Sequence, residues 1–233
     1  MIIKRIIFPI LLSFLLYSCI NTIDGNGNVT KETRSVSDFN KIDISGRYEV
    51  LLNQGDKENL EIEVDENLLE NIKSEVKNNT LIISSKRPVG KSKSLKLYIT
   101  VIDVDDIEVS GAIKLMNKGT YKTDNLDLRA SGAGDIDLDV ETENLTIDMS
   151  GASETKLSGS SKNFDIEISG AGKLDAKKLK TRNTSVDISG AGSAVVFAKK
   201  TLKVDVSGAG SVKYKGNPKI EKDISGAGSV EKL

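Results

Sequence analysis

The hexapeptide DISGAG occurs at residues 187–192 and 223–228, with the variants EISGAG at 167–172 and DVSGAG at 205–210. Between residues 111 and 226 the successive Ser-Gly glycines lie 21, 19, 19, 20, 18 and 18 residues apart. A regular period of this length indicates stacked supersecondary units, each of which contacts only its neighbours. This repeat constrains the fold more than any other feature of the sequence.

The segments between the motifs alternate apolar and polar residues, as in NLTIDMSG (144–151), NFDIEISG (163–170) and LKVDVSG (202–208). A period of two is that of a strand with one buried face, and the repeats contain no helical apolar period. Leucine-rich repeats share the 20-residue spacing but require a Leu-x-x-Leu-x-Leu frame and an asparagine ladder. We find neither pattern in the sequence. We therefore predict an all-β, parallel β-solenoid with coils of roughly 20 residues, in which Ile188, Val206 and Ile224 stack inward.

The glycines of the hexapeptide are expected to form the corners of the coils. Glycine adopts a positive φ without a Cβ clash, and small residues let successive corners approach to the inter-strand spacing of about 4.8 Å. The predicted corner glycines are Gly132, Gly134, Gly151, Gly170, Gly172, Gly190, Gly192, Gly208, Gly210, Gly226 and Gly228.

The N-terminus has the features of an export signal. Lys4 and Arg5 precede an apolar stretch over residues 6–16, which is too short to span a bilayer comfortably. The following Leu-Tyr-Ser-Cys19 resembles a bacterial lipobox, so we expect a signal peptide over residues 1–18 and lipidation of Cys19. The alternative is an uncleaved anchor helix with an incidental cysteine.

Three further segments complete the predicted organisation. Residues 19–37 are polar and rich in Asn, Thr and Gly, as expected of a flexible tether to a solenoid domain over residues 38–233. Residues 39–105 keep strand alternation without the hexapeptide and are interpreted as wider coils of the same solenoid. Residues 65–77 fit a short helix with Asp65 as N-cap or a strand from Ile72 equally well.

Composition argues against several classes of function. The chain has no His, the commonest general base, and its net charge of −1 gives no basic face for nucleic acid. The alternating acids Asp135, Asp137, Asp139 and Glu141 lie on a line, whereas Ca²⁺ needs six to eight converging oxygens, so we predict a solvated face without metal or other cofactor.

Two charge patterns remain. The residues two positions before each Ser-Gly pair would stack as a column of carboxylates, interrupted by Arg129. The repulsion between these like charges requires compensation by Lys and water or by bound cations. The acidic members of the column are Asp43, Glu108, Asp148, Glu167, Asp187, Asp205 and Asp223. Residues 101–150 have 12 acidic and 4 basic residues, whereas residues 171–222 have 4 acidic and 12 basic. Because sequence order is spatial order in a solenoid, this separation of charge makes the molecule an electric dipole. We expect its basic end to contact an acidic surface, which could belong to another copy of the chain, through Lys199, Lys200, Lys203, Lys213 and Lys215.

The lipobox-like leader, the segment FNKIDISGRYEVLL at 39–52 and the serial SGAG coils together resemble the head GIN domain family of autotransporter adhesin-like lipoproteins from Bacteroidota. The resemblance covers roughly residues 38–226 and implies a right-handed parallel β-helix without assigned catalytic residues. We therefore expect a non-catalytic binding module, an adhesin, anchored by lipid to the outer membrane on its periplasmic or cell-surface face. Its expected partners are the membrane and a glycan or protein surface. The alternatives are a carbohydrate-active enzyme on this scaffold and an envelope protein that polymerises end to end through its terminal coil.

Overall fold

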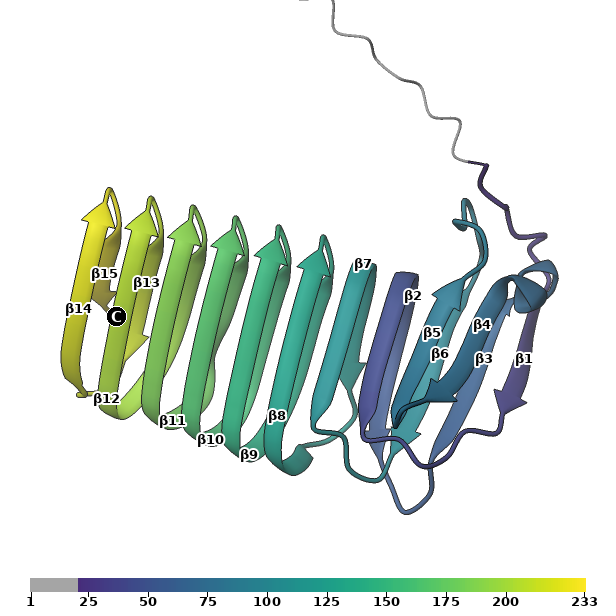
Figure 1. Ribbon diagram of the computed structural model, residues 1–233, viewed down its shortest axis with the longest axis horizontal. Helices are drawn as coiled ribbons and strands as arrows, with labels where there is room; N and C mark the ends of the chain where they lie inside the picture. Colours follow the sequence, from purple (N-terminus) through teal and green to yellow (C-terminus); the bar gives the residue numbers. More distant parts are fainter. Residues whose placement is uncertain (1–20) are drawn as a thin grey trace, which may run out of the picture.

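The computed structural model describes residues 21–233, and the predicted signal peptide and Cys19 lie outside these residues. The chain forms an elongated β-solenoid of about seven turns with coils of roughly 19 residues, as the repeat predicted (Figure 1). The only helix among the described residues is a short 3₁₀ segment, η1 (Glu66–Asn71). Within residues 21–233 no helix has the length and apolar character needed to cross a membrane.

Each regular coil is one long strand that bends midway and so contributes to both sheets of the solenoid. The regular coils are β9 (Asp135–Gly151), β10 (Glu154–Gly170), β11 (Lys173–Gly190) and β12 (Ser193–Gly208), whereas β8 (Tyr121–Gly132) is shorter and pairs with β9 only from Val140 onward. At the C-terminal end β13 (Ser211–Lys215), β14 (Lys219–Gly226) and β15 (Ser229–Lys232) continue the stack, and at the other end the coils of β7 (Asp106–Asn117) and β2 (Lys41–Gln54) begin it.

Parallel pairing in register carries equivalent residues along the whole stack. Ile188 pairs with Val206 and Val206 with Ile224, so the predicted inward column is confirmed. Ile188 and Val206 are fully buried, and the apolar core runs continuously between the two sheets. Alternation of inward and outward side chains explains why the sequence between motifs has a period of two.

Residues 59–101 close the N-terminal end, and the prediction of wider coils there holds only in part: residues 80–85 and 95–101 pair parallel with β2, whereas the remaining pairs are antiparallel. β3 (Asn59–Asp65) pairs antiparallel with β6 (Leu95–Val101), and β4 (Ile72–Lys77) forms a hairpin with β5 (Thr80–Ser85). The hairpin turns at Asn78 and Asn79, which both have a positive φ, the geometry of a two-residue hairpin turn. The β2 coil lies between β7 on one side and β5 and β6 on the other.

The segment over residues 65–77 contains both predicted structures in succession. The 3₁₀ helix η1 ends at Asn71, and strand β4 starts at Ile72. Asp65 stands at the N-cap position but does not cap η1. Its carboxylate instead accepts hydrogen bonds from the backbone N–H groups of Gly27, Lys93 and Ser94.

The predicted tether is partly ordered on this N-terminal cap. β1 (Val29–Arg34) pairs antiparallel with β3, and Ile23 forms a parallel bridge with Val89. The physical reason is that backbone groups of residues 21–34 find partners on the cap, including the Asp65 carboxylate. A free linker is therefore not present from Asn21 through Arg34.

Candidate functional site: a charged groove along the bend of the coils

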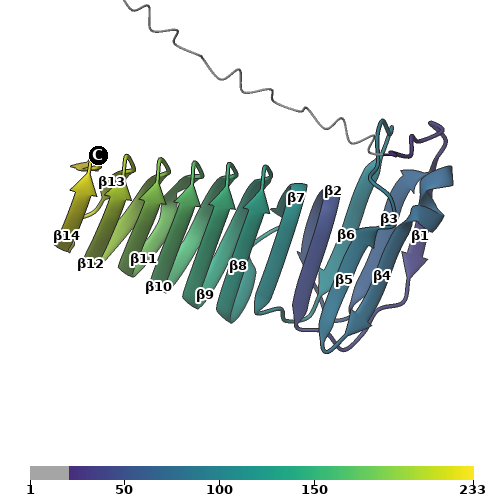
Figure 2. The same cartoon turned by 45° about the horizontal axis from the view of Figure 1, so that its top comes forward.

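The two edges of the solenoid differ, because the tight Ser-Gly corners lie along one and the broad bends of the coils along the other (Figures 1 and 2). At the corner edge the first glycine of each motif has a positive φ, which is +132° at Gly190. A Cβ at Gly190 would lie 2.6 Å from the Gly170 carbonyl oxygen of the coil below. The second glycine is required for a different reason, since a Cβ at Gly192 would lie 2.6 Å from a methyl carbon of Ile168.

The same division holds along the stack. The first glycines with positive φ are Gly132, Gly151, Gly170, Gly190, Gly208 and Gly226. The second glycines, for which no such φ is found, are Gly134, Gly172, Gly192, Gly210 and Gly228. Along the SGAG coils the corner edge is built from small residues.

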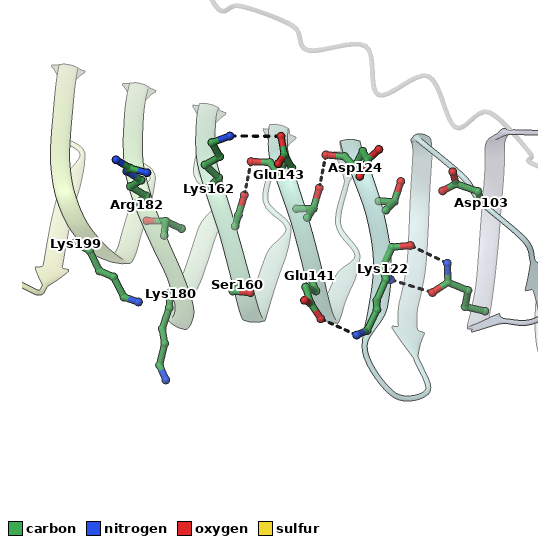
Figure 3. A pocket seen from close by; sticks show the side chains of 15 residues that line it. Asp103, Lys122, Asp124, Glu141, Glu143, Ser160, Lys162, Lys180, Arg182 and Lys199 are labelled. Atoms are coloured by element: carbon green, nitrogen blue, oxygen red, sulfur yellow. Dashed lines mark hydrogen bonds and ion pairs between the residues drawn. The ribbon is translucent and has the colours of Figure 1, made fainter.

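The bend edge carries a groove of about 810 Å³ that crosses several coils (Figure 3). Hydroxyl groups hold the backbone in shape beneath it. The buried Thr142 Oγ1 donates to the carbonyl oxygens of Asp124 at 2.9 Å and Asn144 at 3.0 Å, and Ser161 Oγ donates to the Asn163 carbonyl at 2.7 Å. Each hydroxyl thus satisfies carbonyl groups that the turning chain would leave unpaired.

An asparagine ladder runs beside the bend, although the sequence was interpreted as having none. Asn144 donates to the side-chain oxygen of Asn125 at 2.8 Å, Asn163 to Asn144 at 2.8 Å and Asn183 to Asn163 at 2.9 Å. Thr201 continues the ladder by donating to Asn183 at 2.9 Å. The signal was an Asn six residues before four consecutive Ser-Gly pairs, those at Ser131, Ser150, Ser169 and Ser189.

Four acidic side chains line one half of the groove, and two of them have a basic partner. Glu141 lies 2.9 Å from Lys122 and Glu143 lies 3.5 Å from Lys162. Asp103 and Asp124 line the same half. With four acids and two lysines, this half of the groove keeps a net negative charge.

The other half of the groove is basic and uncompensated. Lys180, Arg182 and Lys199 line it, and none of the three forms an ion pair within residues 21–233. In Figure 3 Lys180, Arg182 and Lys199 lie to the left of the ion pairs formed by Lys162 and Lys122. Lys199 and Lys200 lie opposite the single residue Arg182 at the bend, because the register between β11 and β12 shifts by one residue between Ala198 and Thr201. The groove thus presents three free cations on two adjacent coils, Lys180 and Arg182 on β11 and Lys199 on β12.

The five predicted lysines do not form one surface. Lys199 is in the groove, whereas Lys203 aligns with Ser185 and Glu221 on one sheet and Lys213 aligns with Val195 and Glu231 on the other. Lys215 aligns with Phe197. The structure brings Lys180 and Arg182 to Lys199 instead, and the sequence did not single them out.

The predicted acidic column exists, with Glu167, Asp187, Asp205 and Asp223 in register on consecutive coils. Among residues 21–233 the ion pair within this column lies toward its N-terminal end, where Arg129 pairs with Glu108 and also with Asp106. At the start of the column, burial and the neighbouring Glu108 carboxylate raise the pKa of Asp43.

The acids at 135–141 lie on outward positions beside basic neighbours. Asp135 aligns with Lys114 and Asp137 with Lys156, while Asp139 accepts a hydrogen bond of 2.7 Å from the Ser158 hydroxyl. Among residues 21–233 no group of three or more Cys, Asp or Glu side chains is arranged to hold a metal ion. This stretch is part of a mixed-charge outer surface.

The architecture and the groove define a class of protein, namely a parallel β-solenoid that presents a charged, open surface across successive coils. Within that class the chain belongs to the family described as "putative auto-transporter adhesin, head GIN domain", whose model matches residues 38–218. The comparison with curated proteins gives no match.

Solved structures show the same fold. A putative adhesin from Bacteroides fragilis is 27% identical, with a TM-score of 0.86 over 91% of this chain and 100% of that one. A putative adhesin from Parabacteroides distasonis is 25% identical, with a TM-score of 0.74 over 91% and 100%. A putative lipid binding protein from the same species is 22% identical, with a TM-score of 0.75 over 91% and 99%, and shows the fold alone.

Proposed function

We propose that this protein is an exported, lipid-anchored binding module of the bacterial outer membrane, without catalytic activity, that holds an anionic polymer in the groove at its bend edge. Membership of an adhesin-like family supports the envelope location and the binding role. The single observation that carries the ligand class is the row of free cations Lys180, Arg182 and Lys199 on adjacent coils.

The geometry favours a polymer over a small molecule. Lys180 and Arg182 lie on β11 and Lys199 lies on β12, and adjacent parallel coils are about 4.8 Å apart, so these charges spread along the bend edge rather than converge on one point. A linear acidic glycan can follow that edge and place successive negative groups against successive cations. The open groove suits such a ligand, whereas sites for small molecules bury most of the ligand surface.

The same features argue for binding rather than catalysis. Catalytic sites hold a few groups convergently and exclude water around the reacting atoms. The groove is open, and its charged side chains spread over several coils, with Glu141 and Glu143 each paired to a lysine. A carbohydrate-active enzyme would need convergent acids that this surface does not bring together.

Binding of acidic and neutral polysaccharides to the wild type and to a Lys180→Glu, Arg182→Glu, Lys199→Glu variant tests the ligand class. Exposed charge pairs contribute about 0.2–1 kcal/mol each, so three reversals should weaken binding roughly tenfold or more. The control variant Lys173→Glu, Lys203→Glu, Lys213→Glu has the same charge change outside the groove and should bind as the wild type does. Equal affinity of both variants would refute the groove as the site.

Anchoring is tested separately by metabolic labelling with a fatty-acid probe. The wild type should be labelled and sediment with membranes, whereas Cys19→Ser should be unlabelled and leave the membrane fraction. Equal labelling of both chains would refute lipidation at Cys19 and leave the groove proposal standing.

A further inference from the structure

The loop between β5 and β6, residues 86–94, lies where the described chain begins. Ile23 donates its backbone N–H to the Pro88 carbonyl and accepts a hydrogen bond from Gly90, both at 2.9 Å. The Arg87 guanidinium donates to the Asn21 side-chain oxygen at 2.5 Å. In both views this loop projects beside the first described residues (Figures 1 and 2). The chain is therefore fastened to the loop from Asn21 onward.

This loop is strongly basic. Its sequence KRPVGKSKS contains four cations and no acid, and the side chains of Lys86, Lys91 and Lys93 are exposed. Arg47 adds a fifth cation by donating to the Gly90 carbonyl at 2.6 Å and the Ser92 hydroxyl at 3.0 Å. None of these five side chains forms an ion pair in the part of the chain that the structure describes.

Two acids, Asp24 and Asp65, bind the backbone of the loop rather than its cations. Asp24 accepts the backbone N–H of Lys91 at 2.9 Å, and the buried Asp65 accepts those of Lys93 and Ser94, both at 3.0 Å. These bonds fix the path of the loop while the lysine side chains extend outward. The loop is thus a positioned basic surface.

Its position relative to Cys19 identifies what the surface faces. Two residues of extended chain span at most about 7 Å, so Cys19 lies within that distance of the Asn21 backbone. If Cys19 is acylated, as the proposed function holds, the bilayer surface lies against this loop. A lipid anchor combined with a basic patch binds membranes more stably than a single acyl chain.

We propose that residues 86–94, together with Arg47, form a membrane-contact surface that binds the anionic lipid head groups of the leaflet holding the anchor. Arg47 follows the Gly46 corner, so this surface lies at the corner edge of the solenoid. The groove lies at the opposite, bend edge. Contact between loop and lipid therefore turns the groove away from the membrane and toward its ligand.

The test is co-sedimentation of residues 21–233 with phosphatidylcholine vesicles, with and without phosphatidylglycerol. This chain retains every strand and the whole described core, and lacks the acyl group. The variant Lys86→Gln, Lys91→Gln, Lys93→Gln removes three side chains that form no hydrogen bond, so the fold should be kept. Each basic residue near an anionic surface contributes about a fivefold gain in binding, so the variant should bind the anionic vesicles about 100-fold more weakly.

The matched control is Lys180→Gln, Arg182→Gln, Lys199→Gln, which removes the same charge from the bend edge and should bind vesicles as the wild type does. Equal vesicle binding by the wild type and the loop variant would overturn the proposal. Loss of vesicle binding in the groove variant alone would overturn it as well, because the bend edge would then face the membrane. The lipid anchor is tested separately, because equal fatty-acid labelling of the wild type and Cys19→Ser would refute the anchor without bearing on vesicle binding by residues 21–233.

Discussion

Replacing Gly190 by Ala should destabilise the solenoid far more than replacing Gly119 by Ala, although both glycines have a positive φ. Gly190 is a corner glycine of the central coils, with φ +132°, and Gly119 lies in the connection between β7 and β8, with φ +73°. The two sites separate the cost of an unusual backbone conformation from the cost of close approach between coils.

The magnitude follows from the surroundings of each added methyl group. At Gly119 no atom lies within 4 Å of the new Cβ, so only the left-handed backbone costs free energy, about 1 kcal/mol. At Gly190 the Cβ would lie 2.6 Å from the Gly170 carbonyl oxygen, which also accepts the Ala191 N–H at 2.9 Å. Backbone strain of about 1–3 kcal/mol and a weakened hydrogen bond of about 1 kcal/mol give about 2–4 kcal/mol.

Urea unfolding followed by far-UV circular dichroism and by resistance to proteolysis measures both variants against the wild type. Two probes are needed because a stack of repeats can unfold in parts rather than in one transition. A loss at Gly190→Ala no larger than at Gly119→Ala would show that the coils separate easily, and would refute close stacking as the reason for the corner glycines.

Three further substitutions test other parts of the fold. Thr155→Val should raise the free energy of unfolding by about 1 kcal/mol in urea titrations, because the Thr155 hydroxyl is buried without a hydrogen-bond partner; a loss would contradict this. Asn163→Ala should cost about 1–3 kcal/mol, since Asn163 both donates and accepts in the ladder, and an unchanged unfolding midpoint would show the ladder to be dispensable. Burial acts to raise the pKa of Asp65, but three backbone N–H donors outweigh it and hold that pKa below its usual value. The stability from Asp65 is therefore present above about pH 4 and is lost as pH falls through the lower folded pKa, so Asp65→Asn should be less stable at neutral pH and lose less on acidification.

The coils could be predicted from the sequence because two independent signals agreed. Alternation set which residues face inward, and the Ser-Gly spacing set the register, so Ile188 and Val206 were placed correctly. The glycine corner was likewise readable, since few residues other than glycine fit a positive φ against a neighbouring carbonyl.

The antiparallel pairing in the N-terminal cap was not predicted because alternation does not distinguish parallel from antiparallel strands. Leu60 and Ile62 alternate as a coil would, yet they lie in an antiparallel strand. The sequence signal for antiparallel pairing is local: Asn78 and Asn79 form the two-residue turn of a hairpin.

The groove was missed for a related reason. Outward positions on a solenoid look alike in the sequence, and only the bend distinguishes Lys180 and Arg182 from lysines on the flat sheets. Charge counting found the basic region but assigned its centre to residues that the structure divides between both sheets, Lys203 and Lys213 among them.

The central claim is that the two edges have different partners, and lysine reactivity toward an amine-modifying reagent, read residue by residue by mass spectrometry, tests it most directly. The acylated chain is placed in vesicles containing phosphatidylglycerol, with and without an acidic polysaccharide. We predict that the membrane protects Lys86, Lys91 and Lys93 from modification by the reagent, and that the polysaccharide protects Lys180 and Lys199. Protection of the bend-edge lysines by the membrane, or of the loop lysines by the polysaccharide, would contradict it.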